Sequence, residues 1–269
     1  LDGTNGFVLT GIDNSDLSGN AVSSAGDVNG DGFGDLLIGA YFADRPGADL
    51  AGESYVVFGS GQGFAASLSL GALDGSNGFV LTGIDASDYS GHSVSSAGDV
   101  NGDGFDDILI GASTADLGST NSSEGETYVV FGKSQGFAAS FDLAGLNGSN
   151  GFVLTGIDAG DNSGHAISSA GDFNGDGFDD ILIGAYKADQ TGANDAGESY
   201  VLFGKSHGFA ASYDLSALDG TSGVVFPGID ELDRSGYSVS SAGDVNGDGF
   251  DDILIGAYNA NQTGANGAG

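Results

Sequence analysis

Four stretches of the chain place side-chain oxygen atoms at alternate positions of a short loop. Each reads Asp-x-Asn-x-Asp-Gly-x-x-Asp, and they span residues 27–35, 99–107, 172–180 and 244–252. Ca²⁺ takes about six to eight oxygen ligands in a flexible shell, and a glycine at position six permits the sharp turn that gathers them. The pattern therefore predicts about four calcium ions, one per loop.

The predicted ligands are the side chains at positions one, three, five and nine and the main-chain carbonyl at position seven. They are Asp27, Asn29, Asp31, Phe33, Asp35, Asp99, Asn101, Asp103, Phe105, Asp107, Asp172, Asn174, Asp176, Phe178, Asp180, Asp244, Asn246, Asp248, Phe250 and Asp252. The alternative is a turn that binds no metal, but its converging carboxylates would then repel one another. Position eight, which is Gly34 in the first loop and aspartate in the others, is not an expected ligand.

The residues that follow each loop exclude an EF-hand. That motif carries a glutamate at position twelve and continues into a helix. In the second loop position twelve is Ile110, inside the apolar run Asp-Ile-Leu-Ile-Gly-Ala at 107–112. Short runs rich in β-branched residues and bounded by turn residues are typical of strands, so each loop is expected to join two strands and to be pinned by its ion.

The composition limits the possible partners. The 269 residues carry 5 basic and 38 acidic side chains, a formal net charge of −33, which disfavours nucleic acid and anionic membranes. There is no cysteine, no apolar run long enough to span a membrane and no signal-peptide pattern. Because the chain starts at Leu1 without a methionine, it is expected to be a processed or excised part of a longer protein.

The loops recur every 72 or 73 residues, which predicts a repeat architecture. In the second unit, strand-like runs occupy residues 79–84, 93–98, 107–112 and 128–132. No stretch shows convincing helical periodicity, so the expected fold is all-β. Four short antiparallel strands stacked around an axis form the blade of a β-propeller.

The order of these motifs resembles the FG-GAP repeat of the integrin α-subunit propeller and its bacterial relatives. The pairs that give the repeat its name are Phe58-Gly59, Phe131-Gly132, Phe203-Gly204, Gly39-Ala40, Gly111-Ala112, Gly184-Ala185 and Gly256-Ala257. Tyrosine or serine replaces the proline that follows the second pair. The resemblance covers essentially the whole chain and implies blades whose first strand precedes the calcium loop.

On this numbering the chain is one repeat domain, 1–269. A leading fourth strand lies within 1–18, and the units span 19–90, 91–163, 164–235 and, incompletely, 236–269. The resemblance implies rings of usually about seven blades. Three arrangements therefore stay open: part of a larger array, a closed four-bladed domain, or a linear stack that assembles with other copies.

Alternating strand directions place the calcium loops at one end of the blades and the two-to-three and four-to-one loops at the other. Ligand binding is expected at this second end, on the variable segments 41–52, 113–125, 186–197 and 258–269. The four-to-one loops also repeat an acid pair, for which a turn is preferred over a second set of metal sites. The pairs are Asp13 and Asp16, Asp85 and Asp88, Asp158 and Asp161, and Asp230 and Asp233.

Catalytic signals are weak. His92 and His165 occupy equivalent positions that Asn20 and Tyr237 fill in the other units, which favours a polar site over a shared general base. The phenylalanines at position seven of the loops are expected to pack against neighbouring blades. No enzymatic role is predicted.

These features predict a calcium-stabilised module for binding, adhesion or assembly, secreted or displayed on a cell surface and of bacterial type. The expected partner is a protein or a glycan, or further copies of the chain, without nucleic acid and without insertion into a membrane. Two alternatives stay open: a glycan-binding propeller lectin, and the non-catalytic part of a secreted hydrolase.

Overall fold

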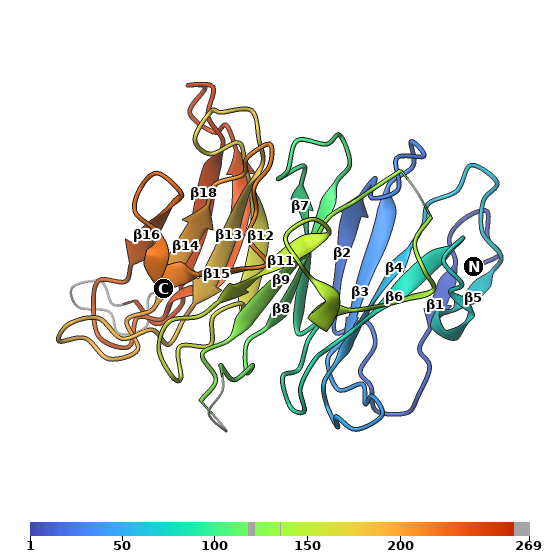
Figure 1. The fold of residues 1–269 in the computed structure, drawn as a ribbon, viewed down its shortest axis with the longest axis horizontal. Helices are drawn as coiled ribbons and strands as arrows, with labels where there is room; N and C mark the ends of the chain where they lie inside the picture. Colours follow the sequence, from blue (N-terminus) through green and yellow to red (C-terminus); the bar gives the residue numbers. More distant parts are fainter. Residues whose placement is uncertain (118–121, 135, 261–269) are drawn as a thin grey trace.

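The computed structural model describes residues 1–117, 122–134 and 136–260, and these residues form an all-β structure. The sheets follow one another in chain order from β1 at one end to β18 at the other (Figure 1). Within the described residues the only helical elements are three single 3₁₀ turns, η1 (Leu70–Ala72), η2 (Leu143–Gly145) and η3 (Leu215–Ala217). The predicted fold class is confirmed.

Three complete antiparallel blades have four strands each. Blade 1 contains β2 (Ala21–Gly26), β3 (Asp35–Ala40), β4 (Glu53–Val57) and β6 (Gly78–Thr82). Blade 2 contains β7 (Ser93–Gly98), β8 (Asp107–Ala112), β9 (Glu126–Val130) and β11 (Gly151–Thr155). Blade 3 contains β12 (Ala166–Gly171), β13 (Asp180–Ala185), β14 (Glu198–Leu202) and β16 (Gly223–Pro227). The first two strands of blade 4 are β17 (Ser235–Gly243) and β18 (Asp252–Ala257).

A short strand in each three-to-four connection crosses to the preceding blade. These strands are β5 (Ser67–Ser69), β10 (Ser140–Asp142) and β15 (Ser212–Asp214), which pair in parallel with β1 (Val8–Thr10), β6 and β11. The sequence prediction missed them, because three residues without a clear apolar pattern carry little signal. They add a hydrogen-bonded link between neighbouring blades.

The predicted third strand was shifted by two residues. The run 128–132 was expected to be a strand, whereas β9 ends at Val130 and leaves Phe131-Gly132 beyond the strand. The Gly132 amide donates to the carboxylate of Asp107 at 2.9 Å instead of to a neighbouring strand. The Phe-Gly pair is therefore part of the connection that closes the aspartate loop.

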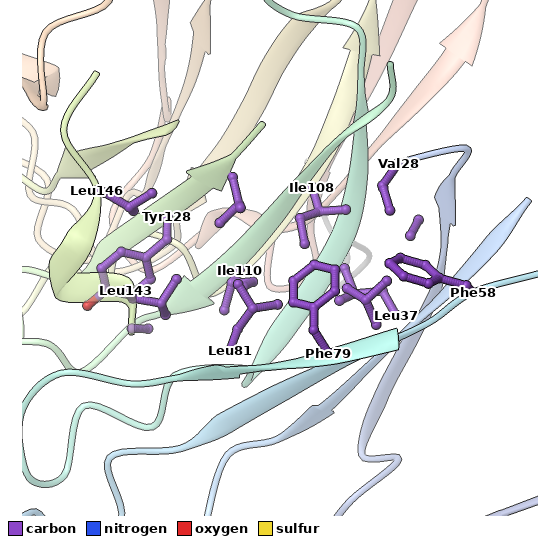
Figure 2. Close-up of a cluster of buried hydrophobic side chains, with 14 of the residues drawn as sticks. Val28, Leu37, Phe58, Phe79, Leu81, Ile108, Ile110, Tyr128, Leu143 and Leu146 are labelled. Carbon is purple, nitrogen blue, oxygen red and sulfur yellow. The ribbon is translucent and has the colours of Figure 1, made fainter. Parts of the chain in front are cut away.

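The hydrophobic core lies between successive blades. Phe79 and Leu81 of blade 1 face Ile108 and Ile110 of blade 2, and the aromatic ring of Tyr128 lies in the same layer (Figure 2). The equivalent layer between blades 2 and 3 contains Phe152, Ile181 and Tyr200 and their neighbours. Each unit thus buries its apolar face against the next one, as the repeat period predicts.

The two outermost faces of the row are open in the described part of the chain. Leu254 in β18 is 61% exposed, whereas the equivalent Leu37, Leu109 and Leu182 are completely buried by the following blade. At the other end, Val22 in β2 is 66% exposed. Blade 4 therefore does not pack against blade 1 here, and the described residues form an open row of blades.

Candidate functional site

The four aspartate loops, loop 1 (27–35), loop 2 (99–107), loop 3 (172–180) and loop 4 (244–252), each join the first and second strands of a blade, as predicted. In loop 2 the carboxylate of Asp99 accepts from the amides of Asp103 at 3.0 Å and Gly104 at 2.9 Å. The Asp103 amide also donates to Asn101 Oδ1 at 2.9 Å. Gly104 has φ +89°, so the sixth position needs glycine. Equivalent bonds fold the other loops.

The aspartate at position nine ties each loop to the end of the third strand. Asp107 is completely buried, and its Oδ2 and Oδ1 accept from the amides of Val100 at 3.1 Å and Gly132 at 2.9 Å. Asp35 and Asp180 make the equivalent pairs of bonds. In loop 4, Asp252 accepts from the Val245 amide at 3.0 Å, and the described residues include no third strand there.

These carboxyl groups are costly to ionise without a counter-charge. Burial raises the pKa of Asp107 to about 8, and the negative charges of Asp103 and Asp99 add to the rise. Burial likewise raises the pKa of Asp35 to about 6 and that of Asp180 to about 7. A nearby cation would favour the ionised form of each group.

The composition of the loops fits a hard divalent cation, since carboxylate, amide and main-chain oxygens are gathered on one acidic turn. In the described ranges, no group of three or more acidic, histidine or cysteine side chains is placed to hold a metal ion by itself. A bound ion would therefore depend also on the asparagine oxygen and the carbonyl at position seven. The predicted ligand set stays a prediction.

The phenylalanines at position seven pack between blades. Phe105, Phe178 and Phe250 each cover the glycine at position four of the preceding loop, and a Cβ on that glycine would lie 2.2–2.3 Å from the ring. Phe33 lies against Gly59 of its own blade and is 45% exposed. The expectation of packing against a neighbouring blade is confirmed for three of the four rings.

Position eight, for which the sequence suggested no role, bonds to the neighbouring loop. Asp106 Oδ2 accepts from the amide of Asp27 at 2.7 Å, across the interface between blades 2 and 1. The available signal was the occurrence of aspartate in three loops and Gly34 in the first. The residues around Asp106 in its own repeat do not indicate that its partner lies in the preceding repeat.

The opposite end of the blades is built by the two-to-three and four-to-one loops, as predicted. The amides of Tyr89 and Ser90 donate to the carbonyls of Leu50 at 3.2 Å and Ala51 at 3.0 Å. Equivalent bonds join 123–124 to 162–163 and 195–196 to 234–235. Parts of the predicted ligand segments 113–125 and 258–269, namely 118–121 and 261–269, lie outside the described residues.

Three of the four repeated acid pairs in the four-to-one loops share a side-chain bond that closes a turn, and in the fourth the amide of Asp233 donates to the carbonyl of Asp230 at 3.3 Å. The amide of Asp85 donates to Asp88 Oδ2 at 3.1 Å, and Asp13 and Asp158 make the same bond to the aspartate three residues on. The preference for a turn over a second set of metal sites is supported by these bonds. The carboxylate accepts from the amide three residues before it, which stiffens the loop.

Aromatic side chains gather where the first strands begin at this end. We call His92, His165, Tyr186, Tyr237 and Tyr258 the ring cluster. The ring centroids of His92 and Tyr237 each lie 5.0 Å from that of His165. The ring centroid of Tyr186 lies 4.5 Å from that of His165, and the ring centroid of Tyr258 lies 4.4 Å from that of Tyr237. Burial lowers the pKa of His165 to about 4, so its imidazole is neutral at pH 7.

The ring cluster borders a groove and carries a basic side chain. The groove has a volume of about 420 Å³ and is lined by the beginnings of the four first strands. Arg234 Nη1 donates to the hydroxyl of Tyr258 at 2.6 Å, and its guanidinium lies 5.9 Å from the centroids of Tyr186 and Tyr258. Lys187 Nζ also lies 5.3 Å from the ring centroid of Tyr186, so the cluster offers flat rings and hydroxyl groups beside two cations.

Asp88 is expected to make stability depend on pH. Burial raises its pKa to about 7, and the charges of Glu126, Asp85 and Asp116 add to the rise. Since the unfolded carboxyl has a pKa near ~3.9, the folded chain holds the extra proton between about pH 4 and 7, and its stability falls as the pH rises through that window. We compare the free energy of unfolding of Asp88→Asn with that of wild type at each pH. The difference should favour the variant by ~2–4 kcal/mol more at pH 8 than at pH 4.

Urea unfolding at the two pH values measures this difference. The exposed Asp49→Asn provides the control for the loss of one surface charge. Equal pH dependence in wild type and Asp88→Asn would show that Asp88 is ionised at no cost in the folded chain.

Comparisons with known proteins agree with this geometry. The model of the family described as FG-GAP repeat matches residues 18–57, 90–130, 163–202 and 235–269. Integrin alpha-4 of Xenopus laevis is 32% identical over 174 residues, which are 63% of this chain and 14% of the relative. Integrin alpha-IIb of Homo sapiens is 33% identical over 187 residues, 68% of this chain and 16% of the relative.

A third relative extends the match. Integrin alpha-V of Gallus gallus is 30% identical over 221 residues, which cover 78% of this chain and 19% of the relative. The chain thus spans less than a fifth of the length of these relatives. Within the described residues, no helix is long and apolar enough to cross a membrane.

Proposed function

The chain belongs to the FG-GAP repeat family, and from this premise we propose that it is a calcium-stabilised extracellular module for adhesion or ligand binding. The observation that carries the proposal is the recurrence, in every unit, of an acidic turn in which the carboxylate at position one accepts from the glycine amide at position six. The relatives named integrin α subunits place the same repeats in proteins of the cell surface. No enzymatic role is part of the proposal.

Calcium is the proposed ion of each aspartate loop. The residues that would hold it are those at positions one, three, five, seven and nine, because they supply the hard oxygens that Ca²⁺ prefers. When bound, the ion would neutralise the buried carboxylate and fix the loop. Its role is structural, since the loops lie at the end of the blades away from the ring cluster.

The proposed ligand surface is the ring cluster with Arg234 and the loops around it. Tyrosine and arginine dominate the energetics of protein interfaces, because rings bury a large area at low entropic cost and a guanidinium donates in several directions. Three of the five basic residues, Arg45, Lys187 and Arg234, belong to loops at this end. The favoured ligand is a protein with an acidic or hydrogen-bonding contact surface.

Binding to immobilised matrix proteins and to a glycan array, in calcium and in EDTA, tests this proposal. We expect calcium-dependent binding to a protein, reduced about tenfold or more by Tyr186→Ala or Tyr237→Ala, as for interface anchors. Lys205→Ala, on the side of the aspartate loops, is the matched control and should bind normally. Binding to a defined sugar class would replace the protein ligand with a glycan, and loss in Lys205→Ala alone would place the ligand on the other face.

A further inference from the structure

The position-eight aspartates, Asp106, Asp179 and Asp251, make the same contact three times. Asp106 Oδ2 accepts from Asp27 N at 2.7 Å, Asp179 Oδ2 from Asp99 N at 2.8 Å, and Asp251 Oδ2 from Asp172 N at 2.9 Å. Each donor is the first residue of the preceding aspartate loop. The contact therefore joins two neighbouring loops directly.

The main chain reinforces each contact in the reverse direction. The amide of Asp106 donates to the carbonyl of Asp27 at 3.3 Å, and the amides of Asp179 and Asp251 make the equivalent bonds at 3.3 Å. The amide of Lys133, which follows the Phe-Gly pair of blade 2, donates to the carbonyl of Val28 at 2.9 Å. Loop 2 is thus held to loop 1 by bonds that run both ways.

The backbone leaves space for the carboxylate. A Cβ on Gly26, which has φ +77°, would lie 2.3 Å from Asp106 Oδ2, and a Cβ on Gly98 or Gly171 would lie 2.1 Å from Asp179 Oδ2 or Asp251 Oδ2. The equivalent Gly243 in blade 4 has no atom within 4 Å of that point. The glycine before each loop therefore accommodates the incoming aspartate wherever a following loop exists in the described chain.

The first loop carries no carboxylate at position eight. Gly34 stands at position eight of loop 1, and a Cβ built on it meets no atom within 4 Å. No described loop precedes loop 1, so a carboxylate here would have no amide to accept from. Aspartate thus occurs at position eight in the three loops that follow another loop of the described chain.

Each contact joins the first predicted ligand of one loop to a residue that stands between two predicted ligands of the next loop. Asp106 stands between Phe105 and Asp107 of loop 2, and its partner Asp27 places a carboxylate that accepts from Asp31 at 3.0 Å and Gly32 at 2.8 Å in loop 1. When loop 2 is ordered, the carboxylate of Asp106 is held in place as the acceptor for the amide of Asp27 in loop 1. A site whose neighbour is already ordered loses less conformational entropy when it binds its ion.

We propose that the position-eight aspartates are positioning residues that couple calcium binding in adjacent loops, so that the four sites fill cooperatively. This inference rests on the proposed function of the loops as calcium sites. The coupling passes through the hydrogen-bond acceptor and not through the charge. Typical couplings between sites change affinity by about 5- to 150-fold, which predicts a Hill coefficient clearly above one for the whole chain.

Calcium titration of the 269-residue chain by isothermal calorimetry tests the coupling. Wild type is expected to bind cooperatively, whereas Asp106→Ala/Asp179→Ala/Asp251→Ala should bind with a Hill coefficient near one and about fivefold or more weaker average affinity. The matched triple asparagine variant retains an oxygen acceptor and should stay cooperative. Gly34→Asp adds a carboxylate that faces no loop and should leave the titration unchanged.

A second readout follows the contact itself. Hydrogen exchange at the amide of Asp172 should become faster in Asp251→Ala, a single change at the end of the row, and should be restored in Asp251→Asn. Equal, independent calcium sites in wild type and in the triple alanine variant would overturn the coupling alone. A wild-type chain that takes up no calcium would overturn the proposed function and the coupling together.

Discussion

Chelation of calcium with EDTA is expected to lower the melting temperature of the chain by more than ~10 °C. A site with a Kd near ~10⁻⁴ M, in calcium at about 100 times that value, gains ~2.7 kcal/mol of stability. A chain of this length shifts by about 2–4 °C for each kcal/mol, and loop 1 to loop 4 would all lose their ions. The physical reason is that the buried carboxylates of Asp35, Asp107 and Asp180 would lose their counter-charge.

Differential scanning calorimetry in calcium, in EDTA and after calcium is restored measures the change. Magnesium at the same concentration is the control, because it demands a tighter octahedral shell and should restore less of the stability. A melting temperature that is the same in EDTA and in calcium would contradict the structural role of the ion.

Truncation of Asp107 is expected to have the largest effect of any single substitution in the loops. Asp107→Ala would leave the buried amides of Val100 and Gly132 without their acceptor. An unsatisfied buried donor costs about 1–3 kcal/mol, so the free energy of unfolding should fall by roughly 2–6 kcal/mol even in EDTA. In calcium the loss should be larger, because a predicted ligand is also removed.

Two matched variants separate these contributions. Asp107→Asn keeps one oxygen acceptor and should lie between wild type and Asp107→Ala. Asp252→Ala removes the equivalent carboxylate in loop 4, where it accepts from the Val245 amide and is only partly buried, and should cost less. Urea unfolding measures all three, and an Asp107→Ala chain within about 1 kcal/mol of wild type would show that the tie to the third strand is unimportant.

Much of the architecture follows from residues that repeat. The period of the aspartate loops gives the number of units, and the apolar runs after them, such as 107–112, give the second strands. The same alternation places the two-to-three loops at the end opposite the aspartate loops. These features are local to one unit, and they recur in all four units.

Several features that sequence reasoning missed join one unit to another. The parallel strands β5, β10 and β15 are three residues long and pair with a strand of the preceding blade. Asp106 likewise takes its meaning from Asp27, 79 residues away. The repeat period predicts that the blades stack, but it does not predict which residues of neighbouring blades then meet.

The ring cluster shows a similar limit. His92, His165 and Tyr237 occupy equivalent positions of the repeat, but only the fold shows that the rings of His92 and Tyr237 each lie 5.0 Å from that of His165. Because the equivalent position is histidine in two units and tyrosine in another, the sequence alone gives little indication of a shared site. In the structure the histidine and tyrosine rings are neighbours in the ring cluster, so units that differ in residue type at this position still contribute to one aromatic surface.

The most direct test of the central claim is a count of bound metal. Native mass spectrometry of the purified chain after dialysis against calcium is expected to give about four calcium ions per chain, falling to about three when the Asp99, Asp103 and Asp107 carboxylates of loop 2 are all changed to asparagine. A folded wild-type chain that carries no calcium under these conditions would contradict the assignment of the aspartate loops as calcium sites.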